Sequence, residues 1–252
     1  MSIEPRVEYT TTSPLVSPGN SSAERDALYE KFKKRISVNI ALNRSLVSYQ
    51  GNKNKPFYSW FKYKEGFSEG LVDYILQRFD PGVLLDPFSG SGAALFAASK
   101  RGWQTVGIEL LPVGIYATQA RLASERVNPL LFETATATIL QINFADWYDE
   151  AYALKHIAIT KGAFPEAEER ELVGYIAYCQ QAISDPDMQL LFLFAAFCIL
   201  EEISYTRKDG QYLRWDARAG RSWGNIPFDK GVIYSFREAI TEKLRQMASD
   251  LK

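Results

Sequence analysis

The sequence contains a single histidine, His156, and only two cysteines, Cys179 and Cys198, in 252 residues. A zinc site needs several closely spaced ligands of these kinds, so their scarcity predicts that the chain has no metal site. An excess of one charge is also missing, because 29 basic and 30 acidic residues leave a formal net charge of −1. The total gives no global signature of a nucleic-acid-binding protein, and charge has to be read segment by segment.

Long apolar runs are absent as well. The longest, residues 190–200, has eleven residues, whereas a membrane-spanning helix needs about 20. This run therefore predicts a buried helix. The N-terminus lacks the charged-then-apolar pattern of a secretory signal. We accordingly expect a cytoplasmic protein with no membrane segment.

Residues 1–55 are expected to form an N-terminal arm followed by a basic helix. Residues 1–23 are rich in Ser, Thr and Pro, and a helix is expected to begin near Ser22, with Leu28, Phe32 and Ile36 at helical spacing. Residues 24–64 hold ten Lys or Arg and three Asp or Glu, a balance of +7, interleaved with aromatic residues. This composition suits contacts with phosphates and stacking on bases. It equally fits a solvated basic helix followed by an aromatic core segment.

Residues 56–128 are expected to form an α/β half-domain. The pattern predicts helices at 67–79, 91–101 and 112–126, and strands at 82–86 and 103–110. Short apolar runs between helices are typical of buried parallel strands, so this order predicts half of an open α/β sheet. Residues 129–252 predict helices at 166–183, 186–205 and 230–251, and no strand.

The turn between the first predicted strand and its helix has the composition of a ligand-binding loop. It reads Asp86-Pro87-Phe88-Ser89-Gly90-Ser91-Gly92, and small residues let a backbone approach a ligand closely. Glu109, at the end of the next strand, is placed to accept hydrogen bonds from ribose hydroxyls. The nicotinamide fingerprint does not fit, because Leu95 occupies the position of its last glycine. An ordinary glycine-rich turn remains the structural alternative.

This turn resembles motif I of the DNA N6-adenine and N4-cytosine methyltransferases, Asp-Pro-Phe-x-Gly-Ser-Gly-Thr, with Ala93 in place of the usual Thr. Residues 107–110 resemble motif II, and residues 64–68 resemble motif X. The resemblance implies a Rossmann-like, S-adenosylmethionine-dependent methyltransferase fold whose sheet is incomplete in this chain, with a largely helical C-terminal region. The cofactor-binding residues that it implies are Phe67, Ser68, Asp86, Pro87, Phe88, Ser89, Gly90, Ser91, Gly92, Glu109 and Leu110, with Tyr58, Trp60 and Lys64 as further members.

A basic segment, residues 203–228, is expected to be a surface loop within the helical region. Its candidates for DNA contact or target recognition are Arg207, Lys208, Arg214, Arg218 and Arg221. The alternative is a loop whose arginines pair with neighbouring acids.

One motif of the family is missing. The catalytic motif places Asp, Asn or Ser before Pro-Pro and an aromatic residue. The polar side chain holds the target amino group, and the aromatic residue stacks on the flipped base. This sequence contains no Pro-Pro pair. The nearest approach is Asn225-Ile226-Pro227-Phe228, which makes Asn225 a weak catalytic candidate.

We therefore expect the N-terminal, cofactor-binding subunit of a split DNA methyltransferase of a restriction–modification system. A second subunit would carry the catalytic motif and the missing strands, since two parallel strands alone cannot bury their faces. Two alternatives stay open: a non-catalytic module that binds cofactor and nucleic acid, and an RNA base methyltransferase.

Overall fold

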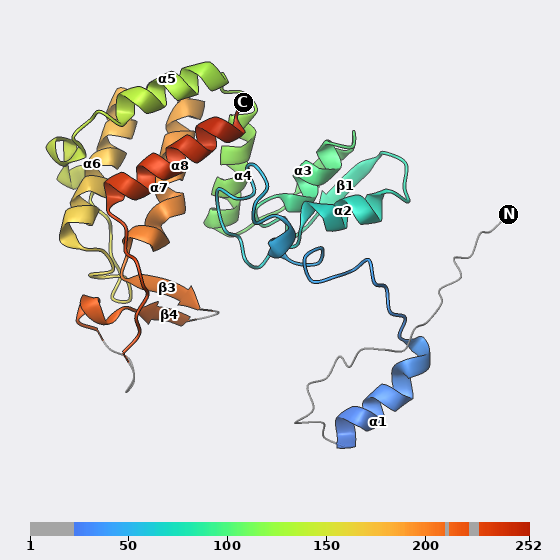
Figure 1. Ribbon diagram of the computed structural model, residues 1–252. Helices are drawn as coiled ribbons and strands as arrows, with labels where there is room; N and C mark the ends of the chain where they lie inside the picture. The colour runs from blue at the N-terminus through green and yellow to red at the C-terminus, as the bar shows by residue number, and fades with distance from the viewer. Residues whose placement is uncertain (1–22, 210–211, 222–226) are drawn as a thin grey trace. The chain divides into compact units, whose positions relative to one another are not determined.

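The computed structural model describes residues 23–209, 212–221 and 227–252 (Figure 1). The chain divides into two units, Met1–Ala41 and Leu42–Lys252. In the first unit, helix α1 (Ala23–Phe32) is followed by the 3-10 turn Lys33–Arg35. The helix begins next to the expected residue, and its apolar side chains Leu28 and Phe32 are exposed, as is Ile36. The predicted arm, residues 1–22, lies outside the described residues.

The second unit opens with the expected alternation of helices and strands. Its elements are α2 (Glu69–Leu76), β1 (Val83–Asp86), α3 (Ala93–Ser99), β2 (Gln104–Gly107) and α4 (Pro112–Ser124). Strands β1 and β2 are parallel, in a register that sets Leu85 beside Val106. Helices α2 and α3 pack together over one face, where Val72, Ala97 and Ala98 meet Leu84. The predicted order for residues 67–126 is confirmed.

The opposite face of this sheet is uncovered. It carries Val83 and Leu85 of β1, Val106 of β2, and Ile108, which lies just beyond the end of β2. These four side chains are 50–65% exposed. Among the described strands, β1 and β2 pair only with each other. Apolar rows of this kind on a two-stranded sheet are normally buried by another element. We call these four residues the open sheet face.

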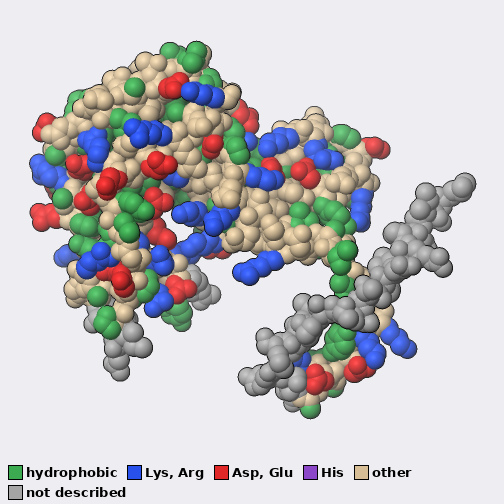
Figure 2. All heavy atoms as spheres, in the orientation of Figure 1, with side chains coloured by type: hydrophobic (Ala, Val, Ile, Leu, Met, Phe, Trp, Pro, Cys, Tyr) green, Lys and Arg blue, Asp and Glu red, His purple; other side chains and the backbone are tan. Residues whose placement is uncertain are grey.

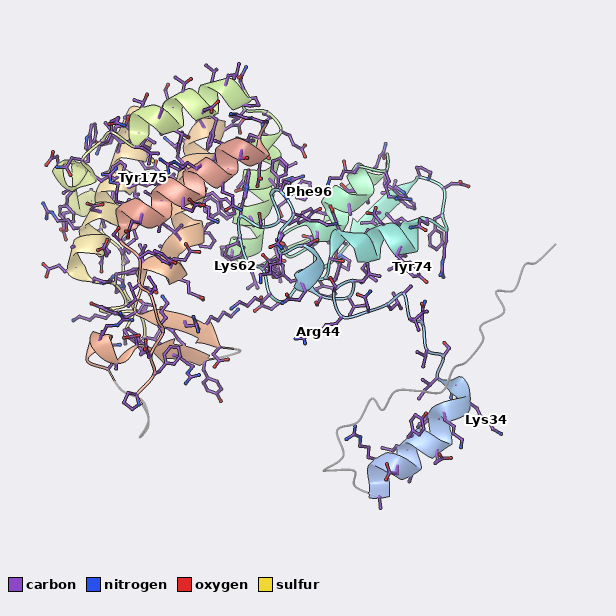
Figure 3. The ribbon with its side chains drawn as sticks, viewed as in Figure 1. Lys34, Arg44, Lys62, Tyr74, Phe96 and Tyr175 are labelled. Atoms are coloured by element: carbon purple, nitrogen blue, oxygen red, sulfur yellow. The ribbon has the colours of Figure 1, made fainter. Side chains whose placement is uncertain are left out.

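The main core lies in the helical region. It contains α4, α5 (Pro129–Ile139), α6 (Glu166–Ala182), α7 (Pro186–Ile203) and α8 (Phe236–Asp250). Helix α7 is apolar on nearly all sides and is therefore buried among α4, α6 and α8. Phe132 stacks on Phe192 with ring centroids 4.9 Å apart, and the buried Tyr175 (Figure 3) donates a hydrogen bond of 2.9 Å to the Phe192 carbonyl.

Helix α8 begins later than the sequence predicted. Residues 230–235 are not helical, so Val232 lies outside the apolar stripe that was expected to include it. The helix starts where Ser235 and Glu238 form a capping box that satisfies the first free N–H groups.

The prediction that residues 129–252 contain no strand is wrong. Strands β3 (Thr206–Asp209) and β4 (Tyr212–Trp215) form an antiparallel hairpin, which replaces part of the expected surface loop. These strands were missed because they are short and charged, and only Thr206 and Trp215 are buried. Their pairing, rather than an apolar alternation, defines them.

Candidate functional site

The turn after β1 is ordered by local hydrogen bonds to the Asp86 side chain and within the backbone. The Asp86 carboxylate accepts from the Phe88 N–H at 3.0 Å, and the Gly92 N–H donates to the Ser89 carbonyl at 2.8 Å. Ser89 is buried and donates its N–H to the Ile108 carbonyl at 3.0 Å. The turn is thereby fastened to the end of β2, while the Phe88 side chain is 88% exposed.

Glu109 braces this turn from the neighbouring strand. Its carboxylate accepts three backbone N–H groups, those of Gly90 at 2.7 Å, Leu110 at 2.8 Å and Leu111 at 2.7 Å. These donors, with that of Leu111 contributing most, hold the pKa of the Glu109 carboxyl below its ordinary value. An ionised carboxylate therefore joins the turn, the end of β2 and the start of α4. We call this arrangement the Glu109 brace.

Two close approaches fix the position of the turn. Gly90 has a φ of +52°, and a Cβ there would lie 2.9 Å from the Tyr63 ring. A Cβ on Gly114 of α4 would lie 2.6 Å from the Gly90 carbonyl oxygen. Tyr63 was expected only as one of the aromatic residues between residues 24 and 64 that suit stacking on bases. Gly114 was not singled out, because a glycine within a helical pattern gives no sign of what it faces.

A small cavity beside the turn is lined by some, but not all, of the cofactor-binding residues expected around motif X; Ser68 and Lys64 do not line it. Phe67 lines this cavity together with Ser91, Tyr58 and Trp60. Ser68 is buried, and its hydroxyl is engaged locally: it donates to the Leu46 carbonyl at 2.6 Å and caps α2 by accepting the Leu71 N–H at 3.3 Å.

The remaining candidates differ in exposure. The indole N–H of the buried Trp60 donates to Asp250 at 2.7 Å, which ties the cavity to α8. Lys64 is exposed, and the Leu110 side chain is also turned to solvent while its N–H joins the Glu109 brace. Pro87 is exposed in the turn. The cavity is also lined by Arg121, which the sequence reasoning missed because it sits in an ordinary helical pattern.

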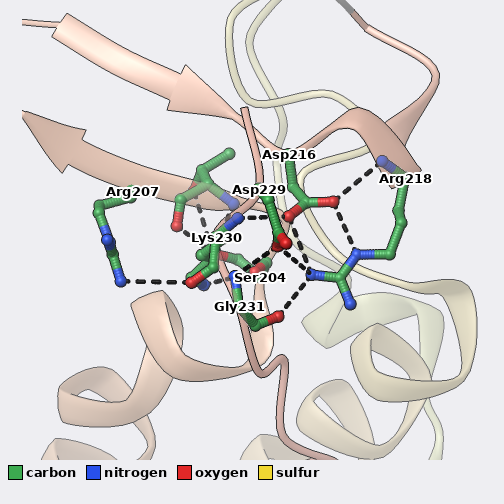
Figure 4. Close-up of polar contacts among 8 residues, drawn as sticks. Ser204, Arg207, Asp216, Arg218, Asp229, Lys230 and Gly231 are labelled. Atoms are coloured by element: carbon green, nitrogen blue, oxygen red, sulfur yellow. Dashed lines mark hydrogen bonds and ion pairs between the residues drawn. The ribbon is translucent and has the colours of Figure 1, made fainter. Parts of the chain in front are cut away.

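The hairpin is anchored by a buried carboxylate (Figure 4). Asp216, 1% exposed, accepts the Arg218 Nε–H at 2.7 Å, an Arg218 Nη2–H at 2.9 Å and the Lys230 backbone N–H at 2.7 Å. The Lys230 ammonium donates to the carbonyls of Glu201 and Ser204. Burial lowers the pKa of Lys230 to about 8. These bonds fasten the hairpin to the end of α7.

The other four basic candidates also have partners within the chain. Lys208 pairs with Glu65 of the motif X segment, and Arg214 pairs with Asp209 at 3.3 Å. Arg207 donates to the Lys230 carbonyl at 3.3 Å, and Arg221 to the Ala158 carbonyl at 3.2 Å. Their role in binding DNA stays a prediction. Asn225, the weak catalytic candidate, lies outside the described residues.

We expect Asp216→Asn to lower the free energy of unfolding by roughly 2 kcal/mol, because an amide cannot accept all of the hydrogen bonds that the carboxylate accepts. The loss is limited because the partner Arg218 is half-exposed, so solvent screens its ion pair. Arg218 holds the pKa of the Asp216 carboxyl well below its usual range. A depressed folded-state pKa stabilises the fold above about pH 4, the ordinary pKa of aspartate, and the benefit is lost as pH falls. Urea unfolding at pH 7 and pH 3 checks this.

The difference in free energy of unfolding between the natural protein and Asp216→Asn should be smaller at pH 3 than at pH 7. Asp229→Asn is the matched control, because Asp229 is exposed and lies 3.9 Å from the same arginine. An equal loss of stability at both pH values would contradict the assignment.

Similarity to known proteins covers nearly the whole chain. Type II methyltransferase M.AvaI of a Nostoc species is 38% identical over 235 residues, 89% of this chain and 47% of that protein. Type II methyltransferase M.BsoBI of Geobacillus stearothermophilus is 33% identical over 245 residues, 91% of this chain and 48% of that protein. The chain is homologous to type II methyltransferases.

The homologous type II methyltransferases are longer proteins: the chain spans about half the length of the curated relatives it matches. A type II methyltransferase of Methanocaldococcus jannaschii, M.MjaII, is 28% identical over 103 residues, 40% of this chain. No family model and no solved structure matches the chain. Within the described residues, no helix combines the length and apolarity needed to cross a membrane.

Proposed function

We propose that this chain is the S-adenosylmethionine-binding subunit of a DNA methyltransferase that methylates an exocyclic amino group of adenine or cytosine. The observation that carries the proposal is the Glu109 brace, which holds the Asp86–Gly92 turn at the adjacent carboxyl ends of two parallel strands. Ligands of open α/β sheets bind at such ends. The homology to type II methyltransferases supplies the chemical class of the ligand, a methyl donor.

The residues at the turn fit such a cofactor. A carboxylate offers about four acceptor positions, and the brace uses three of those on Glu109, which leaves room for a ribose hydroxyl. The left-handed Gly90 keeps the turn free of a side chain next to Tyr63. S-adenosylmethionine supplies an activated methyl group, so the protein mainly has to align methyl and acceptor. No general base is required of this chain.

A second polypeptide supplies the rest of the enzyme in this proposal. The open sheet face, together with the edges of β1 and β2 that pair with no other described strand, offers a surface for further strands and for a covering helix. The chain spans about half of its relatives, and its sequence has no Pro-Pro pair. The simplest arrangement places the catalytic motif, and the completion of a Rossmann-like sheet, on that second polypeptide.

DNA is the proposed substrate, and the hairpin is its proposed contact. Arg207 and Arg214 are directly opposite each other in the hairpin, an arrangement that normally costs stability. The Arg214 guanidinium lies 4.2 Å from the Phe228 ring centroid and that of Arg207 lies 5.9 Å away. Such paired cations suit a phosphate backbone. Elsewhere, as Figure 2 shows, basic and acidic side chains are interspersed over the helical part.

We expect the double variant Arg207→Ala/Arg214→Ala to reduce the slope of log affinity for DNA against log salt by about 2, because two phosphate contacts are lost. Fluorescence anisotropy with a labelled duplex at several salt concentrations measures this slope. Arg126→Ala/Lys252→Ala is the matched control, since both residues are exposed and ion-paired on other helices. If the control variant lowers the slope equally, the hairpin is not a specific contact site for DNA.

Calorimetric titration with S-adenosylmethionine, with and without a second polypeptide carrying the catalytic motif, tests the proposal. Binding together with DNA methylation restored by the second polypeptide supports it. Binding without methylation in any combination would instead indicate a non-catalytic cofactor- and nucleic-acid-binding module, the alternative that the missing Pro-Pro pair favours. Methylation of RNA in preference to DNA would identify an RNA base methyltransferase.

A further inference from the structure

The guanidinium of Arg121 occupies an aromatic enclosure on the inner side of α4. Its central carbon lies 3.7 Å from the Phe57 ring centroid, 5.5 Å from that of Tyr58 and 5.3 Å from that of Phe96. Phe96 projects from α3 toward α4 (Figure 3). Burial lowers the pKa of Arg121 from its ordinary value. The enclosure therefore shields the Arg121 cation from water, while no carboxylate hydrogen-bonds to its Nε or Nη1 atom in place of the water.

Arg121 has N–H groups that no neighbour accepts. Its Nε and Nη1 atoms are sealed from solvent and make no hydrogen bond to any residue that the structure describes. Three acids act on Arg121 electrostatically, Glu125, Glu69 and Asp250. Asp250 accepts from the Trp60 indole at 2.7 Å and Glu69 from Lys55 at 2.6 Å, while Glu125 is exposed and makes no hydrogen bond to either of these two nitrogen atoms. Buried charged donors without acceptors are costly, so these two nitrogen atoms are suited to an anionic ligand.

Phe57 gives an independent indication of a ligand site. It is the only non-glycine residue in the described part of the chain with a positive φ, +66°. Its N–H donates to Asp250 at 3.3 Å, and its ring lies against Arg121. A left-handed phenylalanine is strained, and such strain concentrates where a binding site has to be pre-arranged.

We propose that Arg121 receives the carboxylate of the methionine moiety of S-adenosylmethionine. The cavity at Arg121 is also lined by Ser91 of the motif I turn and by Phe67 of the motif X segment, so it lies next to the turn. Its volume of about 40 Å³ suits a small terminal group rather than a whole nucleoside. Arginine is suited to carboxylates because its planar fork presents several donors at once.

This assignment rests on the proposed function and names a specific group of the cofactor. Decarboxylated S-adenosylmethionine keeps the adenosine, the sulfonium and the amino group but lacks the carboxylate. Calorimetric titration of the natural chain with both compounds should give at least about tenfold tighter binding of S-adenosylmethionine, the range expected for one charged hydrogen-bonded contact. In Arg121→Met that preference should fall to about threefold or less, with most of the loss on S-adenosylmethionine.

Arg121→Lys keeps the charge and should retain an intermediate preference. Arg126→Met is the matched control, because Arg126 lies just beyond the same helix and pairs with Asp187 at its surface. Equal weakening of both ligands in Arg121→Met would show a packing role and overturn the inference.

The natural protein alone also decides the question if the variant fails to fold. Equal affinity of the natural chain for the two compounds overturns the inference while leaving the proposed function intact. Binding of neither compound overturns the proposed function and the inference with it.

Discussion

Glu109→Ala should weaken S-adenosylmethionine binding by at least about tenfold. The substitution removes the acceptor of three backbone N–H groups, at 2.7 Å, 2.8 Å and 2.7 Å. The motif I turn then loses its connection to the end of β2 and to the start of α4. The proposed ribose contact is lost at the same time. Titration calorimetry measures the affinity directly.

Glu166→Ala is the control for this prediction. Glu166 is exposed in the first turn of α6, so its removal alters the net charge equally without touching the motif I turn. The affinity of Glu109→Gln for S-adenosylmethionine should lie between those of Glu109→Ala and the control. Its amide oxygen still accepts hydrogen bonds, while its NH₂ group faces a backbone N–H that it cannot accept. An affinity unchanged in Glu109→Ala would remove the brace from the proposed cofactor site.

Leu85→Asp should abolish methylation by the assembled enzyme while leaving cofactor binding by this chain unchanged. Leu85 is 60% exposed at the centre of the open sheet face, so an aspartate is tolerated in the isolated chain. In the proposed assembly that position is covered, and an unpaired buried carboxylate costs about 4 kcal/mol. Such a cost weakens association about a thousandfold. Size-exclusion chromatography of the mixed polypeptides, with a methylation assay on the eluted fractions, measures both effects.

Leu131→Asp is the matched control, because Leu131 is a leucine on α5 with 63% exposure. This control should assemble and methylate like the natural protein. If Leu85→Asp assembles equally well, the open sheet face is not where the second polypeptide binds.

The sheet elements could be predicted from the sequence because their signals are local. An apolar run ending in Asp86, a glycine-rich turn and a proline at the first position of α4 mark the boundaries of β1, α3 and α4 without reference to the rest of the chain. Helices α6 and α7 were also found, since their apolar patterns are local too. The start of α8 was misplaced, because residues 230–235 are not helical and Lys230 and Gly231 are held by contacts to residues in and next to the hairpin.

The hairpin and the hydrogen-bond partners of the site residues could not be predicted from local sequence signals. Strands β3 and β4 carry little apolar alternation, and their anchor is a carboxylate that meets Arg218 and Lys230 only in the folded chain. The orphaned donors of Arg121 depend on aromatic rings from two separate segments, Phe57 and Tyr58 on one and Phe96 on α3. Properties that arise from tertiary contact leave no periodic trace in the sequence.

The central claim is that this chain holds the methyl donor and that another polypeptide completes the enzyme. The most direct measurement is nucleoside analysis of DNA incubated with S-adenosylmethionine and the chain, with and without a second polypeptide carrying the Pro-Pro-aromatic motif. The account predicts N6-methyladenine or N4-methylcytosine only when both polypeptides are present. Methylated bases formed by this chain alone, or none formed by the pair while both are folded and associated, would contradict it.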